Sequence, residues 1–109
     1  MSTPTHTVIS PAEINTDNLS VPAQSILSRS LLENDKLKWM LFQFAEGQEL
    51  SEHTASMPAI INILDGSFDC KIGEETLIAQ PGTLIYMEPN TPHSLKAKKT
   101  ASFYLMLLK

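Results

Sequence analysis

Two histidines, His53 and His93, are the side chains of this 109-residue chain best suited to do chemistry. Imidazole has an ordinary pKa of ~6.5, so it exchanges protons near neutral pH, and its neutral form is a good ligand for divalent metals. We therefore interpret both residues as candidate acid/base groups and as candidate ligands of a divalent metal, with Zn, Fe, Ni, Mn and Cu all open. Two imidazoles leave most of a coordination sphere to water or substrate, so such a metal would be held weakly.

The residues around His53 form a spaced pattern that resembles the first motif of the cupin superfamily. That motif runs Gly, five residues, His-x-His, three or four residues, Glu, six residues, Gly. Gly47, His53 and Gly66 match it in register. Ala55 stands at the second His and Ala59 at the Glu, so two of the family's ligand positions carry no ligand atoms.

The residues before His93 resemble the second cupin motif, which runs Gly, five residues, Pro-x-Gly, two residues, His, three residues, Asn. Gly82 and His93 match by identity, whereas Glu88 and Ala97 do not. Asn90 stands at the second Gly, and Asn tolerates the positive φ that such a turn requires better than most residues do.

The resemblance implies a single-domain, all-β fold, the cupin jelly-roll β-barrel or double-stranded β-helix, over residues 25–109. Residues 1–24 are polar and without a sustained period, which predicts an extended or partly disordered N-terminal arm. In a cupin barrel the two motifs lie on facing strands, so both imidazoles would point into one cavity. We expect the pocket to be lined by His53, His93, Met57, Ile61 and Ile63.

Cupins include dioxygenases, isomerases, epimerases, sugar binders and storage proteins, so the resemblance leaves the activity open. The first hypothesis is a protein that binds a small molecule in the barrel cavity, with or without metal-independent catalysis. The alternatives are a divalent-metal-dependent oxygenase or isomerase, a metabolite-sensing accessory module, and a pair of histidines that serve only as hydrogen-bonded residues at the barrel mouth. A non-haem iron site needs a carboxylate, and Glu49 shares the strand parity of His53 but lies about 13 Å away along a regular strand.

The apolar pattern predicts strands throughout the domain. Residues 24–32 and 37–45 flank a polar turn at 33–36, and later strands are expected at 59–64, 67–72, 75–79, 83–87 and 101–108. Between 37 and 45 the two faces of the strand are both largely apolar, which favours a sheet covered on each side. Cupins of this length commonly dimerise, and we expect a homodimer that covers such a face.

Composition excludes several classes. No apolar run reaches the ~20 residues that span a bilayer, and the first ten residues lack a secretory pattern, which predicts a cytoplasmic protein without a membrane partner. The net charge of -4 disfavours a nucleic-acid partner, because that affinity comes largely from cations that neutralise phosphates. Cys70 alternates with Phe68 and Ile72 and is expected to be a small buried hydrophobe.

Overall fold

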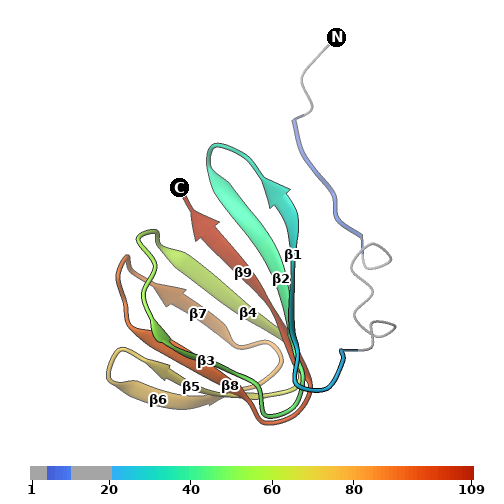
Figure 1. Ribbon diagram of the computed structural model, residues 1–109. Helices are drawn as coiled ribbons and strands as arrows, with labels where there is room; N and C mark the ends of the chain where they lie inside the picture. The colour runs from blue at the N-terminus through green and yellow to red at the C-terminus, as the bar shows by residue number, and fades with distance from the viewer. Residues whose placement is uncertain (1–4, 11–20) are drawn as a thin grey trace.

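The computed structural model describes residues 5–10 and 21–109, and within these ranges the chain forms strands and turns without a helix. The strands build two antiparallel sheets that face each other (Figure 1). The prediction of an all-β fold is therefore confirmed. Of the predicted arm, residues 1–4 and 11–20 lie outside the described residues. The strands are β1 (Ile26–Glu33), β2 (Leu37–Phe44), β3 (Glu49–His53), β4 (Ala59–Asp65), β5 (Phe68–Ile72), β6 (Glu75–Ala79), β7 (Leu84–Met87), β8 (His93–Ala97) and β9 (Ala101–Leu108).

Strands far apart in the chain become neighbours in both sheets. The larger sheet has the order β1-β2-β9-β4-β7, and the smaller sheet has the order β3-β8-β5-β6. The chain therefore passes between the sheets several times, as expected for a double-stranded β-helix. The pairing of β3 with β8 brings the two histidine-containing segments side by side, although they are about forty residues apart in the sequence.

Strand β2 has two apolar faces, as its sequence predicts. Phe42 and Phe44 point between the sheets, where they pack against the core. On the opposite face Leu41 and Gln43 are only 1% and 6% exposed. Both surfaces of this part of the larger sheet are thus removed from water.

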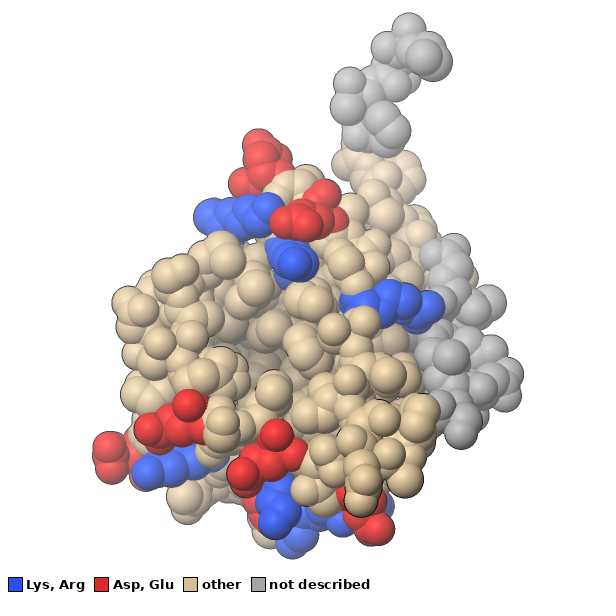
Figure 2. All heavy atoms as spheres, in the orientation of Figure 1, with Lys and Arg blue, Asp and Glu red and all other residues tan. Residues whose placement is uncertain are grey.

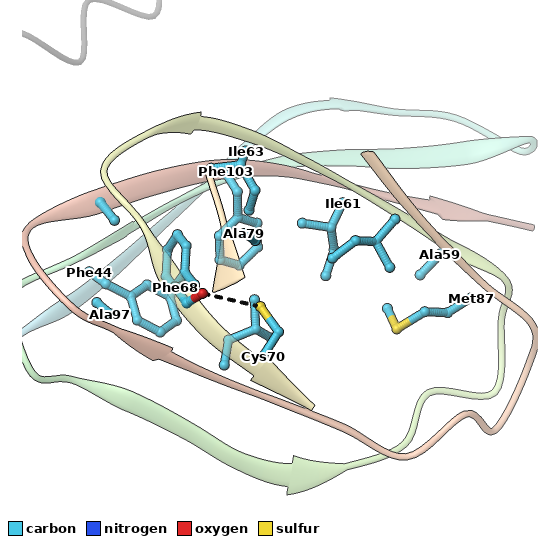
Figure 3. Packing of buried hydrophobic residues seen from close by; sticks show 13 residues of the cluster. Phe44, Ala59, Ile61, Ile63, Phe68, Cys70, Ala79, Met87, Ala97 and Phe103 are labelled. Atoms are coloured by element: carbon cyan, nitrogen blue, oxygen red, sulfur yellow. Dashed lines mark hydrogen bonds between the residues drawn. The ribbon is translucent and has the colours of Figure 1, made fainter. Parts of the chain in front are cut away.

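An aromatic cluster fills the narrow end of the space between the sheets (Figure 3). The rings of Phe44, Phe68 and Phe103 contact one another in edge-on or tilted geometry, with centroids 5.2–5.6 Å apart, and Phe42 stacks on Phe103. Cys70 belongs to the same cluster, and its Sγ lies 3.9 Å from the Phe68 carbonyl oxygen. The expectation that Cys70 is a buried hydrophobe is met, and burial raises the pKa of its thiol to about 11.

Two turns use the residues that the motifs supply. Gly66 has φ +73°, and a Cβ at this position would collide with Ala101 and with the carbonyl oxygen of Thr100, so only glycine fits. Asn90 has φ +65°, as expected for a residue that replaces glycine. Its backbone N–H donates to the carbonyl of Ala55 over 2.7 Å, which ties the second motif to the first.

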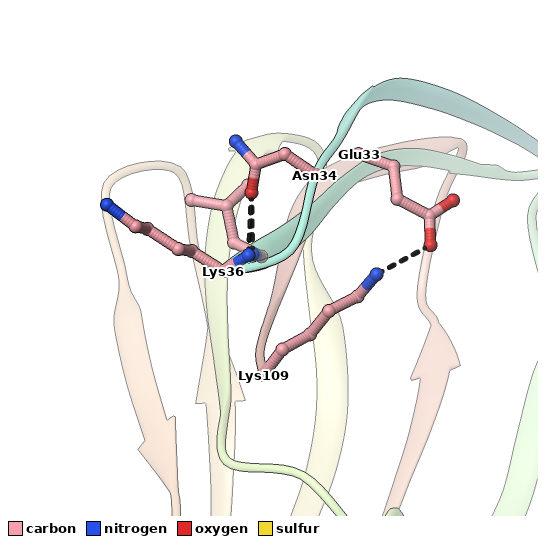
Figure 4. Close-up of polar contacts among 5 residues, drawn as sticks. Glu33, Asn34, Lys36 and Lys109 are labelled. Carbon is pink, nitrogen blue, oxygen red and sulfur yellow. Dashed lines mark hydrogen bonds and ion pairs between the residues drawn. The ribbon is translucent and has the colours of Figure 1, made fainter.

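Polar contacts hold the β1–β2 turn and tie the C-terminal residue to it (Figure 4). The Asn34 side chain accepts hydrogen bonds from the backbone N–H groups of Lys36 and Leu37, at 2.8 and 3.0 Å. Lys109 reaches from the C-terminus to Glu33, with 2.9 Å between Nζ and Oε2.

Charged side chains gather near the upper and lower margins of the face in Figure 2, and the centre of that face is uncharged. Within the described residues, no helix is long and apolar enough to span a membrane.

Candidate functional site: a histidine pair at the barrel cavity

A bulge in β3 decides which of its side chains face the interior. Leu50 pairs with Leu95 and His53 pairs with His93. A step of three residues along β3 is therefore matched by a step of two residues along β8, which leaves one extra residue in β3. The extra residue turns His53 to the same side as Leu50, and both line the interior cavity. The expectation that Glu49 shares the face of His53 is wrong, since Glu49 lies on the outer surface of the smaller sheet.

The two imidazoles lie next to each other across the β3–β8 pair. Their ring centroids are 4.2 Å apart, and the ring planes are inclined by 55°. His93 is only 7% exposed, whereas His53 is exposed at the mouth. The structure therefore brings together the two candidate acid/base and metal-ligating residues, one in the barrel wall and one at its entrance.

Each imidazole is oriented by a backbone carbonyl two residues earlier. His53 Nδ1 lies 2.8 Å from the Ser51 oxygen, and His93 Nδ1 lies 2.8 Å from the Thr91 oxygen. A carbonyl oxygen can only accept, so each Nδ1 carries the proton of its neutral ring and donates it to that oxygen. Both Nε2 atoms are then acceptors with a free lone pair.

Neither Nε2 atom has a partner among the described residues. The buried side-chain nitrogens and oxygens left without a partner there are Trp39 Nε1 and Ser102 Oγ, both on the outer side of the larger sheet. His93 is only 7% exposed, but its Nε2 atom is not one of these buried unpartnered atoms. This nitrogen therefore keeps some contact with solvent. Both acceptors are therefore available to a ligand or to solvent.

The histidines open onto a cavity of about 70 Å³ between the sheets. Its remaining wall is hydrocarbon and consists of Phe42, Leu50, Ile61, Leu95, Phe103 and Leu105. Of the three apolar residues that the sequence nominated, Ile61 lines this cavity. Ile63 is packed in the core at 1% exposure, and Met57 is half-buried in the segment between β3 and β4; neither lines the cavity.

Burial lowers the pKa of His93, and the neighbouring His53 lowers it further. The hydrogen bond to the Thr91 carbonyl acts in the opposite direction, because the carbonyl oxygen stabilises the charged ring more than the neutral ring. Desolvation is the larger effect, so His93 favours its neutral form. An imidazole that is neutral at physiological pH can accept a proton or a hydrogen bond at Nε2.

The residues present do not fit a resident metal cofactor. Ala55 and Ala59 stand where the cupin motif has a His and a Glu, and neither side chain has a metal-donor atom. Ala55 is half-buried and Ala59 is 2% exposed in the core. In the described ranges, no three His, Cys, Asp or Glu side chains lie close enough together to hold an ion. Two nitrogen ligands are fewer than a structural or catalytic zinc site, or a non-haem iron site, takes from the protein.

Other polar residues near the motifs face away from the cavity. Glu88 is exposed after β7, and Tyr86 is 55% exposed on the outer face of that strand. Tyr104 lies on the outer face of β9, where its ring meets Trp39 edge-on with centroids 5.4 Å apart. None of the three supplies a hydroxyl or a carboxylate to the histidine pair.

Comparison with known proteins identifies the family. A family model described as "Cupin domain" matches residues 40–108, which include both histidine motifs and strands β2 to β9 in whole or in part. The chain belongs to the cupin family. No curated protein matches this cupin at a significant level.

Solved structures share the fold of this cupin over most of its length. A cupin superfamily protein from Desulfitobacterium hafniense has a TM-score of 0.77 at 20% identity, with 83% of each chain covered. A conserved protein of unknown function from Streptococcus pyogenes has a TM-score of 0.76 at 25% identity, with 99% of this chain and 90% of that chain covered. KdgF from a Halomonas species has a TM-score of 0.74 at 15% identity, with 85% of this chain and 90% of that chain covered.

Proposed function

We propose that this cupin binds a small molecule at the imidazole pair, with the apolar part of the ligand in the cavity between the sheets. The observation that carries the proposal is the pair of free Nε2 acceptors, on His53 and His93, at the mouth of an otherwise hydrocarbon cavity. Ligand sites characteristically combine a mostly apolar wall with a few convergent polar groups. Both parts are present here.

A purely structural role accounts less well for this arrangement. Most side-chain polar atoms inside folded proteins have a hydrogen-bond partner within the protein or an ordered water. Here each Nδ1 is hydrogen-bonded to a backbone carbonyl, and both Nε2 atoms stay free to accept a hydrogen bond from a ligand or from water. The backbone bonds fix the rings, as they would in a preformed site.

A divalent-metal-dependent oxygenase or isomerase is the second candidate. The favouring observation is the Nδ1 bond to a backbone carbonyl, which also orients metal-binding histidines and raises the basicity of the other nitrogen. Against it, Ala55 and Ala59 leave two ligand positions without donor atoms. We rank it second and propose no catalytic step through a metal.

The test uses the full chain and three single substitutions. A small-molecule library is screened by thermal shift and then by NMR titration, against wild type and the His53→Phe, His93→Phe and His6→Phe variants. Phe keeps a flat ring and removes the acceptor, and His6 lies outside the cavity and is exposed, which makes its variant the control. We expect ligands that raise the melting temperature of wild type and His6→Phe and lose most of this effect in the two site variants.

Metal analysis of protein purified without chelator separates the two candidates. About one divalent ion per chain that is lost from both site variants, and retained by His6→Phe, would overturn the ranking. A ligand that stabilises all four proteins equally binds elsewhere, and it would refute the proposed site. Because His93 is buried, circular dichroism of each variant must first match that of wild type.

A further inference from the structure

The free polar side-chain atoms that line the cavity are all hydrogen-bond acceptors. Of its eight lining residues, six present only hydrocarbon, and the remaining two are His53 and His93. Both histidines give their only neutral-state proton to a backbone carbonyl. Among the residues that the structure describes, the neutral site therefore offers a ligand two hydrogen-bond acceptors and no side-chain donor.

We infer that the ligand is a compact neutral alcohol, and preferably a vicinal diol, whose hydroxyl groups donate to the two Nε2 atoms while a short alkyl group enters the cavity. This inference rests on the proposed function and narrows it to a substrate class. It follows from matching of donors to acceptors, since a lone pair is satisfied only by a proton donor.

Two adjacent hydroxyl groups suit two imidazoles that lie side by side. The imidazoles belong to directly paired residues with centroids 4.2 Å apart, so a ligand at the mouth meets both at once. A vicinal diol carries two donors about one hydrogen-bond length apart, and each can be directed at a different ring. A simple alcohol satisfies one acceptor and leaves the other to water.

The cavity limits the size of the alkyl group. Its volume of about 70 Å³ lies well below the ~300–1,000 Å³ of clefts that bind drug-sized ligands. A short alkyl chain therefore fits against Leu50, Ile61 and Leu95. A sugar ring or an aromatic ring would have to remain outside it.

Charged and acceptor-only head groups are disfavoured for separate reasons. A carboxylate or a ketone would place its lone pairs against those of the imidazoles, and a buried acceptor without a donor loses the hydrogen bonds it had in water. An ammonium group can donate, but it must leave water beside six hydrocarbon side chains, where an unpaired charge is costly. A neutral hydroxyl group avoids both costs.

The test compares four probes of similar size: butane-1,2-diol, butan-1-ol, butan-2-one and butyrate. Titrations are followed at about pH 8, above the ordinary imidazole pKa of ~6.5, by NMR of the methyl groups of Leu50 and Ile61 and by long-range proton–nitrogen spectra of the imidazoles. The same spectra report which ring nitrogen carries the proton. His6→Phe serves as the control and His53→Phe as the variant that loses one acceptor.

We expect the diol to bind at least tenfold more tightly than the ketone or butyrate, with butan-1-ol between them. His53→Phe should reduce the advantage of the diol over butan-1-ol, and His6→Phe should leave it unchanged. Equal or tighter binding of butyrate or the ketone would overturn the inference and leave the proposed function standing. Failure of all four probes to perturb the cavity, together with no library ligand at the site, would overturn the proposed function itself. A zinc titration in which micromolar zinc displaces the diol and stays bound would favour the metal alternative instead.

Discussion

Replacing Gly66 by alanine should destabilise the barrel far more than the same change at Gly47, although both glycines belong to the first motif. Both have positive φ, +73° and +83°, so each substitution costs about 1–2 kcal/mol for placing a side chain in the left-handed region. Only at Gly66 does the new Cβ meet other atoms, and these include the Thr100 carbonyl and the Ala101 Cα, which cannot rotate away. Such overpacking typically adds about 1–3 kcal/mol.

The expected loss is therefore about 2–5 kcal/mol for Gly66→Ala and about 1–2 kcal/mol for Gly47→Ala, whose Cβ has no atom within 4 Å. Urea denaturation followed by circular dichroism measures both. With a slope of about 1–3 kcal/mol per molar urea, the additional loss lowers the midpoint of Gly66→Ala by roughly 1 M below that of Gly47→Ala. Equal midpoints for the two variants would show that the barrel relaxes around the new methyl group, and the steric argument would fail.

Three further predictions concern charge, reactivity and assembly. Folding lowers the pKa of His93, so the unfolded chain binds a proton at this residue more readily than the folded chain does. The free energy of unfolding should therefore fall as the pH drops from about 7 through the ordinary imidazole pKa of ~6.5 and on through the lower pKa of the folded state. Urea melts of wild type and His93→Gln at several pH values should show a smaller fall in the variant, and identical pH profiles would contradict this. Burial holds the pKa of Cys70 at about 11, so native protein should react with iodoacetamide near pH 8 about a hundredfold more slowly than urea-unfolded protein, as measured by mass spectrometry. An equal rate in both states would be inconsistent with a buried thiol. The homodimer remains a prediction, supported by Leu84 and Tyr86, whose side chains are 70% and 55% exposed on one face of β7. Light scattering should give a mass twice the 12.1 kDa of one chain, and a monomer at all concentrations would refute the prediction.

Much of the fold follows from local pattern. The alternation in 37–45 and the turn residues at Asn34, Gly66 and Asn90 predict β2 and three of the turns, and the structure agrees to within one or two residues. The segments 49–53 and 93–97 are harder, because their strands are short and interrupted by charged residues. Hydrophobic alternation therefore predicts no strand there, and only the resemblance of the two motifs to those of cupins places these residues on strands.

The composition of the cavity could be predicted only in part. Ile61 follows from the alternation of β4, whereas the pattern of β2 does not show which of its two apolar faces, and so whether Phe42, meets the cavity. Leu50 was missed because the bulge in β3 breaks the two-residue period on which parity arguments depend. Ile63 has the same parity as Ile61 but lies deeper among the aromatic rings, and depth along a strand is set by the opposite sheet rather than by its own sequence.

The bulge between Leu50 and His53 also decides what kind of dyad stands beside His93. In a ladder without the extra residue, Glu52 would take the place opposite His93, and His53 would turn to solvent. The entrance would then hold a carboxylate next to an imidazole, an arrangement that carries a negative charge and attracts cations. Shortening the strand by Ser51, in contrast, would keep the two imidazoles opposite each other in a regular ladder. In this barrel the register of one strand, set by a single bulge, therefore selects between an acid–imidazole dyad and a bis-imidazole dyad.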